Sequence, residues 1–393
     1  MNSIRTLRWL EDISYLSLEL PKRHKSLFFK KSKVEFFNEL AAVKTSINTL
    51  SNYEIKLQIA KIIASIGDAH TSVPFQINLL LPLEFYWFSD GIYVIAAPLE
   101  YKDILYCKIK KVNELPIEEV ITTLSSIISY ENEPYLKSQL PKYFPAIELL
   151  YDLEIVNDID SLELTFEDGN KDIRTLEIES LPLMESRKKL KLLNNNVVDN
   201  VNLALYRRYS DKNYWFQYLD ISKTLFFKYN VCRNMLPKDV FTFCSELIEF
   251  IKHHDVEKLV IDLRNNFGGN SSLLDPFIEA IKHCNKVNKK GSIFVIIGRE
   301  TFSSALLNAL SLKTNTSAIF IGEPTGGKPN CYGEVQRFTL KNSKLIVCYS
   351  TEYYKTIEDD AILSLMPDVS IVLTIQNYIN NEDPSFEYII NNY

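Results

Sequence analysis

The sequence has few of the residues from which disulfide frameworks and metal sites are built. It contains six cysteines and five histidines in 393 residues. The cysteines form no CxxC pair and no Cys/His metal spacing, and they stand at Cys107, Cys232, Cys244, Cys284, Cys331 and Cys348. We therefore expect neither a disulfide framework nor a metal site, and no cofactor. Cys331, in a glycine-rich segment, is the candidate for an exposed thiol.

Long apolar runs are absent as well. The sequence has no stretch of about 18 apolar residues, which excludes a membrane-spanning helix. Residues 1–12 are too charged to supply the apolar segment of a signal peptide. With a net charge of -6 and scattered lysines, the chain also lacks the concentrated basic surface of a nucleic-acid binder. The sequence predicts a soluble, cytoplasmic protein without membrane or nucleic-acid partners.

The hydrophobic pattern changes its period along the chain. Residues 1–75 repeat at helical spacing, which predicts a helical amino-terminal domain. Residues 76–185 are rich in strand patterns, interrupted by one helical stretch at 117–130. A polar linker is expected over 186–212. Residues 213–393 alternate strand and helix, which is typical of βαβ units, so the sequence predicts a multi-domain α/β protein.

Within the expected core, the most informative segment is 301–305, with the sequence Thr-Phe-Ser-Ser-Ala. It lies between an expected buried strand at 292–297 and an amphipathic helix at 305–312. A serine hydroxyl placed there would meet the positive end of a helix, where it can serve as a nucleophile. The alternative is that the serines only cap the helix.

A second strand ends in glycines upstream of this segment. The apolar run 259–263 leads through polar residues to Gly268 and Gly269. Because α/β sheets place ligands at the carboxyl ends of their strands, backbone N–H groups of these glycines could donate to a developing oxyanion. The N–H of Ser304 would be their partner. An ordinary strand-to-helix turn is the alternative, although it needs only one glycine.

Four segments in this order resemble the S41 serine peptidases, the family of the tail-specific (carboxy-terminal processing) proteases and the tricorn core protease. They are 262–269, 301–305, 322–328 and 367–369, and the resemblance is strong over about 180 residues. It implies a ClpP/crotonase-like core with Ser303 as the nucleophile. Sliding the serine motif by one position would assign Ser304 instead.

The resemblance offers two general bases. His70, in a Gly-Asp-Ala-His-Thr segment, is similar to the histidine of the tricorn-like branch, and histidine titrates near operating pH. Lys328 aligns with the lysine of the Ser-Lys dyad in the tail-specific branch. A dyad lysine needs a pKa lowered by burial, and the glutamine that follows it in that branch is replaced here by Tyr332. We therefore rank His70 first.

For the acidic residue of a tricorn-like site, the resemblance points to the cluster at 358–360. Glu358 is the first choice and Asp360 the second, although a carboxylate cluster in a loop is usually just solvated. The other four histidines, at 24, 253, 254 and 283, lie in basic or helix-ending stretches and are expected to be solvated or capping residues.

The segment 105–116 resembles part of a PDZ-like module, which docks peptides by adding a strand to a sheet edge. The sequence thus predicts a serine-type peptidase acting on peptide or protein substrates, with a homo-oligomer left open. One alternative is a Ser303–Lys328 dyad peptidase of the tail-specific type. Others are a non-catalytic binder of an apolar ligand or peptide on the same fold, and a PDZ-like adaptor.

Overall fold

The computed structural model of the protein describes residues 3–197 and 202–393. The α-helices are α1 (Ile4–Arg23), α2 (Lys33–Ser46), α3 (Asn52–Ala64), α4 (Ile117–Ser125), α5 (Glu133–Tyr143), α6 (Ile147–Asp152), α7 (Leu183–Val197), α8 (Val240–His253), α9 (Asp275–Lys282), α10 (Ser304–Asn315), α11 (Ile375–Ile379) and α12 (Pro384–Asn392). Short 3-10 helices are η1 (Leu99–Ile104), η3 (Leu205–Arg207) and η4 (Ser271–Leu273). The predicted α/β class, with helices and several sheets, is confirmed.

The strands form two larger sheets and two strand pairs. The core sheet has the order β16 (Val369–Ser370), β13 (Ile319–Gly322), β12 (Ile293–Ile297), β11 (Lys258–Asp262), β10 (Thr224–Tyr229) and β9 (Tyr214–Leu219). The middle sheet has the order β2 (Glu84–Phe88), β3 (Gly91–Ala96), β4 (Lys108–Val112), β6 (Ser161–Glu167) and β7 (Ile173–Glu179), with β5 (Leu115–Pro116) on β4. The pairs are β14 (Cys331–Thr339) with β15 (Ile346–Tyr354) and β1 (Leu79–Leu80) with β8 (Leu181–Pro182).

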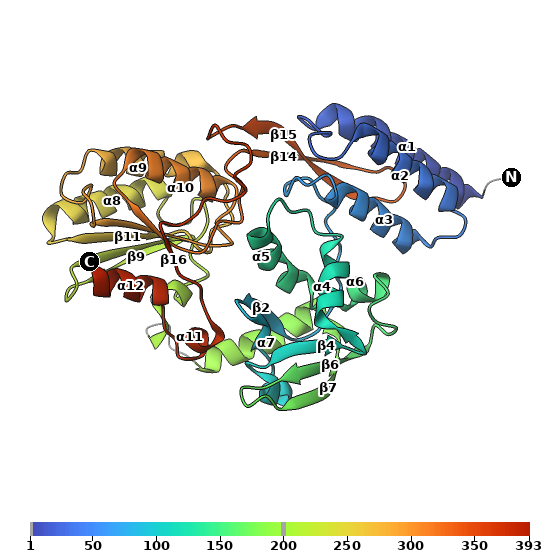
Figure 1. Cartoon of the computed structure of the whole chain (residues 1–393), viewed down its shortest axis with the longest axis horizontal. Coiled ribbons are helices and arrows are strands. Elements are labelled where there is room, and N and C mark those ends of the chain that lie inside the picture. Colours follow the sequence, from blue (N-terminus) through green and yellow to red (C-terminus); the bar gives the residue numbers. More distant parts are fainter. Residues whose placement is uncertain (1–2, 198–201) are drawn as a thin grey trace.

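The core sheet is parallel except for β9, and its central strands are buried on both faces. One face carries Phe227, Ile261 and Val295 against helices α8, α9 and α10. The opposite face, with Val260 and Phe294 among its residues, packs against α12. Figure 1 shows these two layers of helices on either side of the sheet. Every parallel strand therefore points its carboxyl end at the same edge.

Helices α1, α2 and α3 form a separate apolar cluster that the β14–β15 hairpin completes. Phe338, Leu340 and Val347 of the hairpin are buried among the helix residues. Asp12 on α1 accepts hydrogen bonds from the backbone N–H groups of Asn342 (3.0 Å) and Ser343 (2.7 Å) near the hairpin tip. As Figure 1 shows, the hairpin reaches from the core to the amino-terminal helices, so it ties together segments about 300 residues apart.

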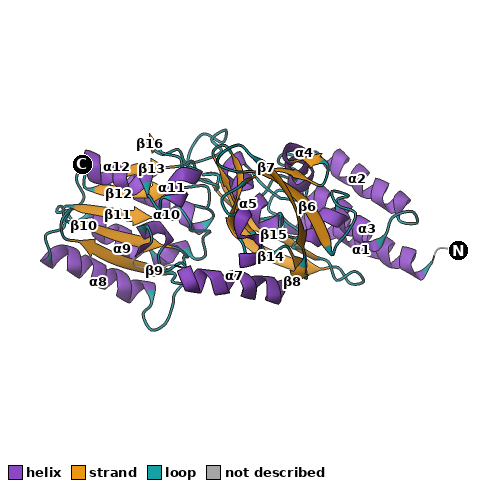
Figure 2. Cartoon of the chain, turned by 90° about the horizontal axis from the view of Figure 1, so that it is seen from below, coloured by secondary structure: helices purple, strands orange, loops and turns teal. Residues whose placement is uncertain are grey.

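The middle unit contains two helices that the sequence pattern did not indicate, α5 and α6. Proline residues Pro134 and Pro141 obscure the pattern of α5, because Pro134 stands in its first turn and Pro141 inside it. Helix α7 occupies part of the segment expected to be a linker, and it runs from the middle unit toward the core (Figure 2). The domain limits themselves stay a prediction. Over the described ranges, no helix is long and apolar enough to cross a membrane.

Candidate active site

The serine segment forms a tight turn between β12 and α10. Thr301 holds it, because its Oγ1 accepts from the Gly298 N–H (3.1 Å) and donates to the Leu263 carbonyl (2.9 Å). Ser303 itself has φ 53° and ψ -127°. That backbone conformation is rare for a residue with a side chain and persists only where the surroundings enforce it. The strain falls on the residue assigned as the nucleophile.

The two serines of the turn differ in what their hydroxyl groups do. Ser304 Oγ donates to the Gly269 carbonyl at 2.7 Å, and the residue is 8% exposed. Ser303 makes no capping hydrogen bond to the helix, and its Oγ has no partner elsewhere in the described ranges. A hydroxyl committed to a backbone carbonyl is poorly placed to attack a substrate. The geometry therefore favours Ser303 over Ser304 as the candidate nucleophile.

The glycine loop after β11 lies directly against this turn. A Cβ on Gly268 would come within 2.9 Å of Ser303 Cβ and of Ser304 N, and one on Gly269 within 2.2 Å of the Cys232 carbonyl oxygen. Their φ angles of 105° and 135° also disfavour any side chain. Gly268 is therefore needed for the loop to approach the serine turn, and Gly269 for it to approach the Cys232 backbone.

Asn266 fixes the glycine loop and uses one of the N–H groups expected to bind an oxyanion. Its Oδ1 accepts from Gly268 N–H at 2.9 Å, and its Nδ2 donates to the Tyr229 carbonyl at 2.9 Å. The N–H groups of Gly269 and Ser304 have no acceptor among the described residues. Of the three donors considered, these two are the ones left free for an oxyanion.

His70 is brought to the serine turn from the loop after α3. Its ring stacks on Phe302, the residue before Ser303, with a centroid distance of 4.5 Å and an interplanar angle of 23°. Neither ring nitrogen has a hydrogen-bond partner within the described part of the chain. Burial lowers the pKa of His70 below its ordinary value, against an opposing effect of the Asp68 carboxylate. The imidazole is therefore held neutral, which is the form that a general base requires.

Asp68 organises the loop that carries His70. Its carboxylate is buried and accepts from His24 Nε2 (3.1 Å), Thr71 Oγ1 (2.5 Å), Ser350 Oγ (2.7 Å) and the backbone N–H of His70 (2.9 Å). Burial alone would raise its pKa, but the hydrogen bonds led by His24 hold the pKa below its usual value. Asp68 Oδ1 lies 3.9 Å from His70 Nδ1.

Two sequence expectations near this loop were wrong. His24 was expected to be solvated or capping, yet it is 4% exposed and pairs with Asp68. The fold buries it because α1 ends against the hairpin strand that carries Ser350. Cys331 was the candidate for an exposed thiol, yet it is 5% exposed and burial raises its pKa to about 12.

Lys328 ends a glycine loop that packs on the serine helix. A Cβ on Gly327 would come within 2.7 Å of Leu306 Cδ2, and one on Gly326 within 2.2 Å of the Arg299 carbonyl oxygen. The Lys328 side chain is half-buried. In the described part of the structure it has no carboxylate within ion-pair distance. The loop thus brings the lysine to the same region as His70 without committing it to a partner.

The two acidic residues chosen from the resemblance lie at the surface. Glu358 is fully exposed and pairs with Lys355 at 3.4 Å. Asp360 is exposed as well, and its Oδ1 accepts from Asn330 Nδ2 (2.6 Å) and Tyr353 OH (3.0 Å). Neither makes an ion pair with His70 over the residues that the structure describes. Their assignment as the acid stays a prediction that this geometry does not favour.

A cleft of about 1250 Å³ opens between the carboxyl edge of the core sheet and the middle unit. Arg299 crosses it: its guanidinium donates to the Trp87 carbonyl of β2 and pairs with Glu323 at 2.7 Å. The cleft includes residues 298–300, immediately before the serine turn. Arg299 could not be singled out from the sequence, because an arginine after a buried strand carries no pattern of its own.

Comparisons with known proteins bear on the family and the fold. Residues 234–371 match the model described as peptidase family S41. No curated protein matches the sequence. Among solved structures, the structure of mature CPAF complexed with lactacystin has a TM-score of 0.68 at 13% identity, covering 100% of both chains. The crystal structure of mature CPAF has a TM-score of 0.69 at 12% identity over 99% of both chains. At these identities the likeness shows a shared fold.

Proposed function

Because residues 234–371 match the model of peptidase family S41, we propose that the protein is a serine-type peptidase that cleaves peptide bonds through an acyl-enzyme on Ser303. The observation that carries the proposal is the strained backbone of Ser303, φ 53° and ψ -127°, with a hydroxyl that makes no capping bond to α10 and has no partner among the described residues. Maintaining such a conformation costs roughly 1–3 kcal/mol, which a purely structural helix cap does not require.

In the proposed reaction, Ser303 Oγ attacks the scissile carbonyl carbon while His70 Nε2 takes the hydroxyl proton. The carbonyl becomes an oxyanion, which the N–H groups of Gly269 and Ser304 stabilise. His70 then gives the proton to the departing amine, and water releases the acyl group by the same steps in reverse order. Hydrogen bonds of this kind are often long in free enzymes and tighten with substrate, which accommodates the unpartnered ring of His70.

The cleft supports a polypeptide substrate. Its volume of about 1250 Å³ can hold several residues of an extended chain, and its lining reaches residues 298–300 but includes neither Ser303 nor His70. The edge strand β2 borders it, and its Trp87 carbonyl is already held by Arg299. Docking of a peptide along this edge, as a PDZ-like module would do, is part of the proposal.

The dyad with Lys328 is the competing mechanism within the same function. Its half-buried ammonium group has no ion-pair partner among the described residues, so it could reach a substrate or Ser303. Against it, His70 already contacts the residue next to Ser303. We therefore keep His70 as the base and assign Lys328 to substrate binding. A non-catalytic binder would leave the Ser303 strain without a use.

The test compares Ser303→Ala with Ser304→Ala in hydrolysis of fluorescein-labelled casein and in labelling by a fluorophosphonate probe mapped to peptides. We expect the label on Ser303, no label or hydrolysis in Ser303→Ala, and retention of both in Ser304→Ala. Label on Ser304 would move the nucleophile by one residue. A folded wild-type protein that takes no label and cleaves nothing would overturn the peptidase proposal in favour of the binder.

A further inference from the structure

Glu131 carries an unpartnered buried carboxyl oxygen that the proposed reaction has not used. It lies between helices α4 and α5. Its Oε2 is shielded from solvent and has no hydrogen-bond partner in the described ranges. Leaving a polar atom in this state costs free energy, so such groups call for an explanation at a functional site.

The chain on both sides of Glu131 is fastened to the neighbours of His70. On one side, Ser129 Oγ donates to the Thr71 carbonyl at 2.7 Å, and Thr71 follows His70 in sequence. On the other side, the Tyr135 ring packs on Phe302 with a centroid distance of 4.4 Å. Phe302 is the ring on which His70 stacks. Glu131 therefore lies in a short segment whose two ends both contact the surroundings of the His70 ring.

A third anchor ties the same segment to the Lys328 loop. Asn132 Nδ2 donates to the carbonyls of Thr325 (3.2 Å) and Leu363 (2.7 Å) and to Ser364 Oγ (3.0 Å). Asn132 is itself 5% exposed. With Thr325 three residues before Lys328, the segment that carries Glu131 is held between the His70 loop and the lysine loop.

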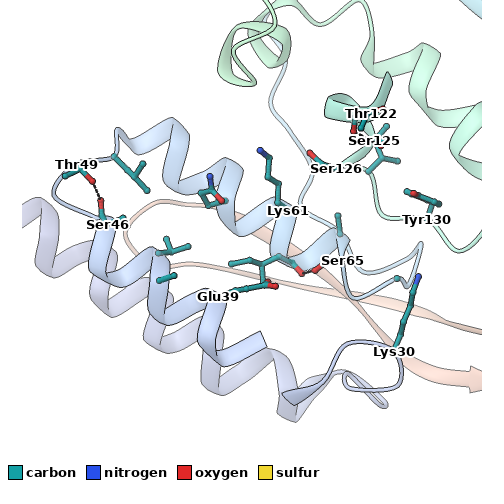
Figure 3. Close-up of a pocket in the computed structure, with 18 residues that line it drawn as sticks. Lys30, Glu39, Ser46, Thr49, Lys61, Ser65, Thr122, Ser125, Ser126 and Tyr130 are labelled. Atoms are coloured by element: carbon teal, nitrogen blue, oxygen red, sulfur yellow. Dashed lines mark hydrogen bonds between the residues drawn. The ribbon is translucent and has the colours of Figure 1, made fainter. Parts of the chain in front are cut away.

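Charged and titratable groups of several elements surround Glu131. They are Asp68 after α3, Lys328 before β14, Lys30 between α1 and α2, Tyr135 on α5, and Cys331 and Tyr332 at the start of β14. Lys30 and the neighbouring Tyr130 also line a cavity of about 770 Å³ between α2, α3 and α4 (Figure 3). The groups around Glu131 therefore carry charges of both signs, from the buried Asp68 carboxylate and from the two lysines.

The remaining acidic residues near the site are already occupied or exposed. The Asp68 carboxylate accepts four hydrogen bonds and holds the loop. Glu358 is fully exposed and forms an ion pair with Lys355. Asp360 lies at the surface and accepts hydrogen bonds from Asn330 and Tyr353. Among the acids considered, Glu131 is the one that is buried and still has an oxygen free to accept.

We propose that Glu131 is the acidic positioning residue of this active site, its free carboxylate oxygen accepting the Nδ1–H of His70 once a substrate or covalent probe engages Ser303. The inference rests on the proposed function. It replaces an acid from the carboxyl-terminal segment with one from the middle unit. In the reaction the proton passes from Ser303 Oγ to His70 Nε2 and the Oγ–C bond forms. The Nδ1 proton stays on the ring, and the Glu131 carboxylate stabilises the imidazolium.

Ionisation of Glu131 gives this arrangement a characteristic pH dependence. Burial, followed by the Asp68 charge and opposed by Lys328 and Lys30, raises the pKa of Glu131 to about 8. Below that pH the carboxyl group is protonated and neutral, so it cannot stabilise the positive charge of the His70 imidazolium as a carboxylate does. The rate at Ser303 should therefore rise as the pH passes through about 8, above the range in which His70 itself loses its proton.

The experiment measures the second-order rate of fluorophosphonate labelling at Ser303 between pH 6 and pH 10, which needs no knowledge of the natural substrate. The variants are Glu131→Gln, Glu131→Asp and, as a matched control, Glu133→Gln, whose carboxylate is exposed and pairs with Lys137. We expect about a hundredfold loss in Glu131→Gln together with loss of the rise near pH 8. Glu131→Asp should keep the rise at a reduced rate, and Glu133→Gln should behave as the wild type.

Wild-type rates and an unchanged pH profile in Glu131→Gln would overturn the inference. So would an equal loss in the Gln and Asp variants without any change in the profile, because that pattern indicates packing alone. If Glu131→Gln does not fold, the profile of Glu131→Asp decides: a preserved rise near pH 8 supports the proposal, and its absence contradicts it. If the wild-type protein takes no label, the result contradicts the proposed function instead. Failure of the proposed function can therefore be told apart from failure of the inference about Glu131.

Discussion

The ring of His70 lies stacked on the ring of Phe302 at a centroid distance of 4.5 Å, one residue before the strained Ser303. Two segments more than 200 residues apart in the sequence meet in this contact. The stacking sets the plane of the imidazole next to the serine turn, and neither ring nitrogen has a hydrogen-bond partner among residues 3–197 and 202–393. Phe302 therefore has a role in orientation that its place in the motif does not suggest.

Replacing Phe302 should weaken the activation of Ser303 more than it weakens substrate binding. Aromatic pairs of this geometry contribute about 0.5–1.5 kcal/mol beyond their area burial. We expect Phe302→Leu to reduce the labelling rate at Ser303 by up to about tenfold, with kcat falling more than KM changes. Tyr135→Phe, which keeps its ring against Phe302, is the matched control. Equal rates for Phe302→Leu and wild type would show that the stacking does not orient His70.

The lowered pKa of His70 predicts where activity is lost in acid. Burial depresses this pKa below the ordinary value of 6.5, and the neutral ring is the working base. The limb that His70 contributes to the labelling rate, measured in Glu131→Gln so that the rise near pH 8 is absent, should therefore lie below pH 6.5. The free energy of unfolding should also fall in acid. Below pH 6.5 the unfolded chain binds a proton at His70 that the folded chain does not, so the unfolded state is favoured. An acid limb at or above pH 6.5 in Glu131→Gln would contradict the burial of the base.

The raised pKa of Glu131 has the opposite consequence for stability. A carboxyl group with a folded pKa of about 8 favours the folded state while protonated. That contribution is present below the unfolded pKa near 4.5 and is lost as the pH rises through 8. The loss is on the order of a few kcal/mol. Thermal unfolding of Glu131→Gln should match wild type at pH 5 and exceed it at pH 9, whereas Glu133→Gln should match it at both. A Glu131→Gln protein less stable than wild type at pH 9 would show that burial does not raise the pKa of Glu131.

Gly269 should be intolerant of any side chain. An added Cβ would lie 2.2 Å from the Cys232 carbonyl oxygen at a φ of 135°, so Gly269→Ala must displace the loop that supplies an oxyanion donor. We expect labelling to fall at least a hundredfold, since loss of one such donor costs about 10²–10³ in rate. Gly169→Ala is the control, because nothing lies within 4 Å of its added Cβ. Near-normal labelling in Gly269→Ala would remove this glycine from the proposed oxyanion site.

The sequence was sufficient to predict the core because its signals are local. Buried parallel strands read as continuous apolar runs, and the strand predicted at 292–297 contains β12 (Ile293–Ile297). Helices α5 and α6 escaped detection because prolines and short length hide their period. The hairpin's role in the helical cluster could not be foreseen either, since Phe338 and Val347 meet α1–α3 only through the tertiary fold.

The same division holds for the site. Ser303, His70 and the glycines stand in motifs, so the sequence could nominate them. His24 and Glu131 stand in no motif, and their burial depends on how distant loops pack. Asp68 belongs to the same Gly-Asp-Ala-His-Thr segment as His70, yet the donors of its four hydrogen bonds come from segments as distant as Ser350. Nothing in the local pattern distinguishes an exposed acid such as Glu358 from a buried one.

The central claim is that His70, and not Lys328, activates Ser303. It is tested most directly by the fluorophosphonate labelling rate of Ser303 in His70→Ala and Lys328→Ala, measured on folded protein at pH 8. The account predicts at least a hundredfold loss in His70→Ala and a labelling rate within about tenfold of wild type in Lys328→Ala. Labelling that survives in His70→Ala and disappears in Lys328→Ala would contradict it and establish the serine–lysine dyad.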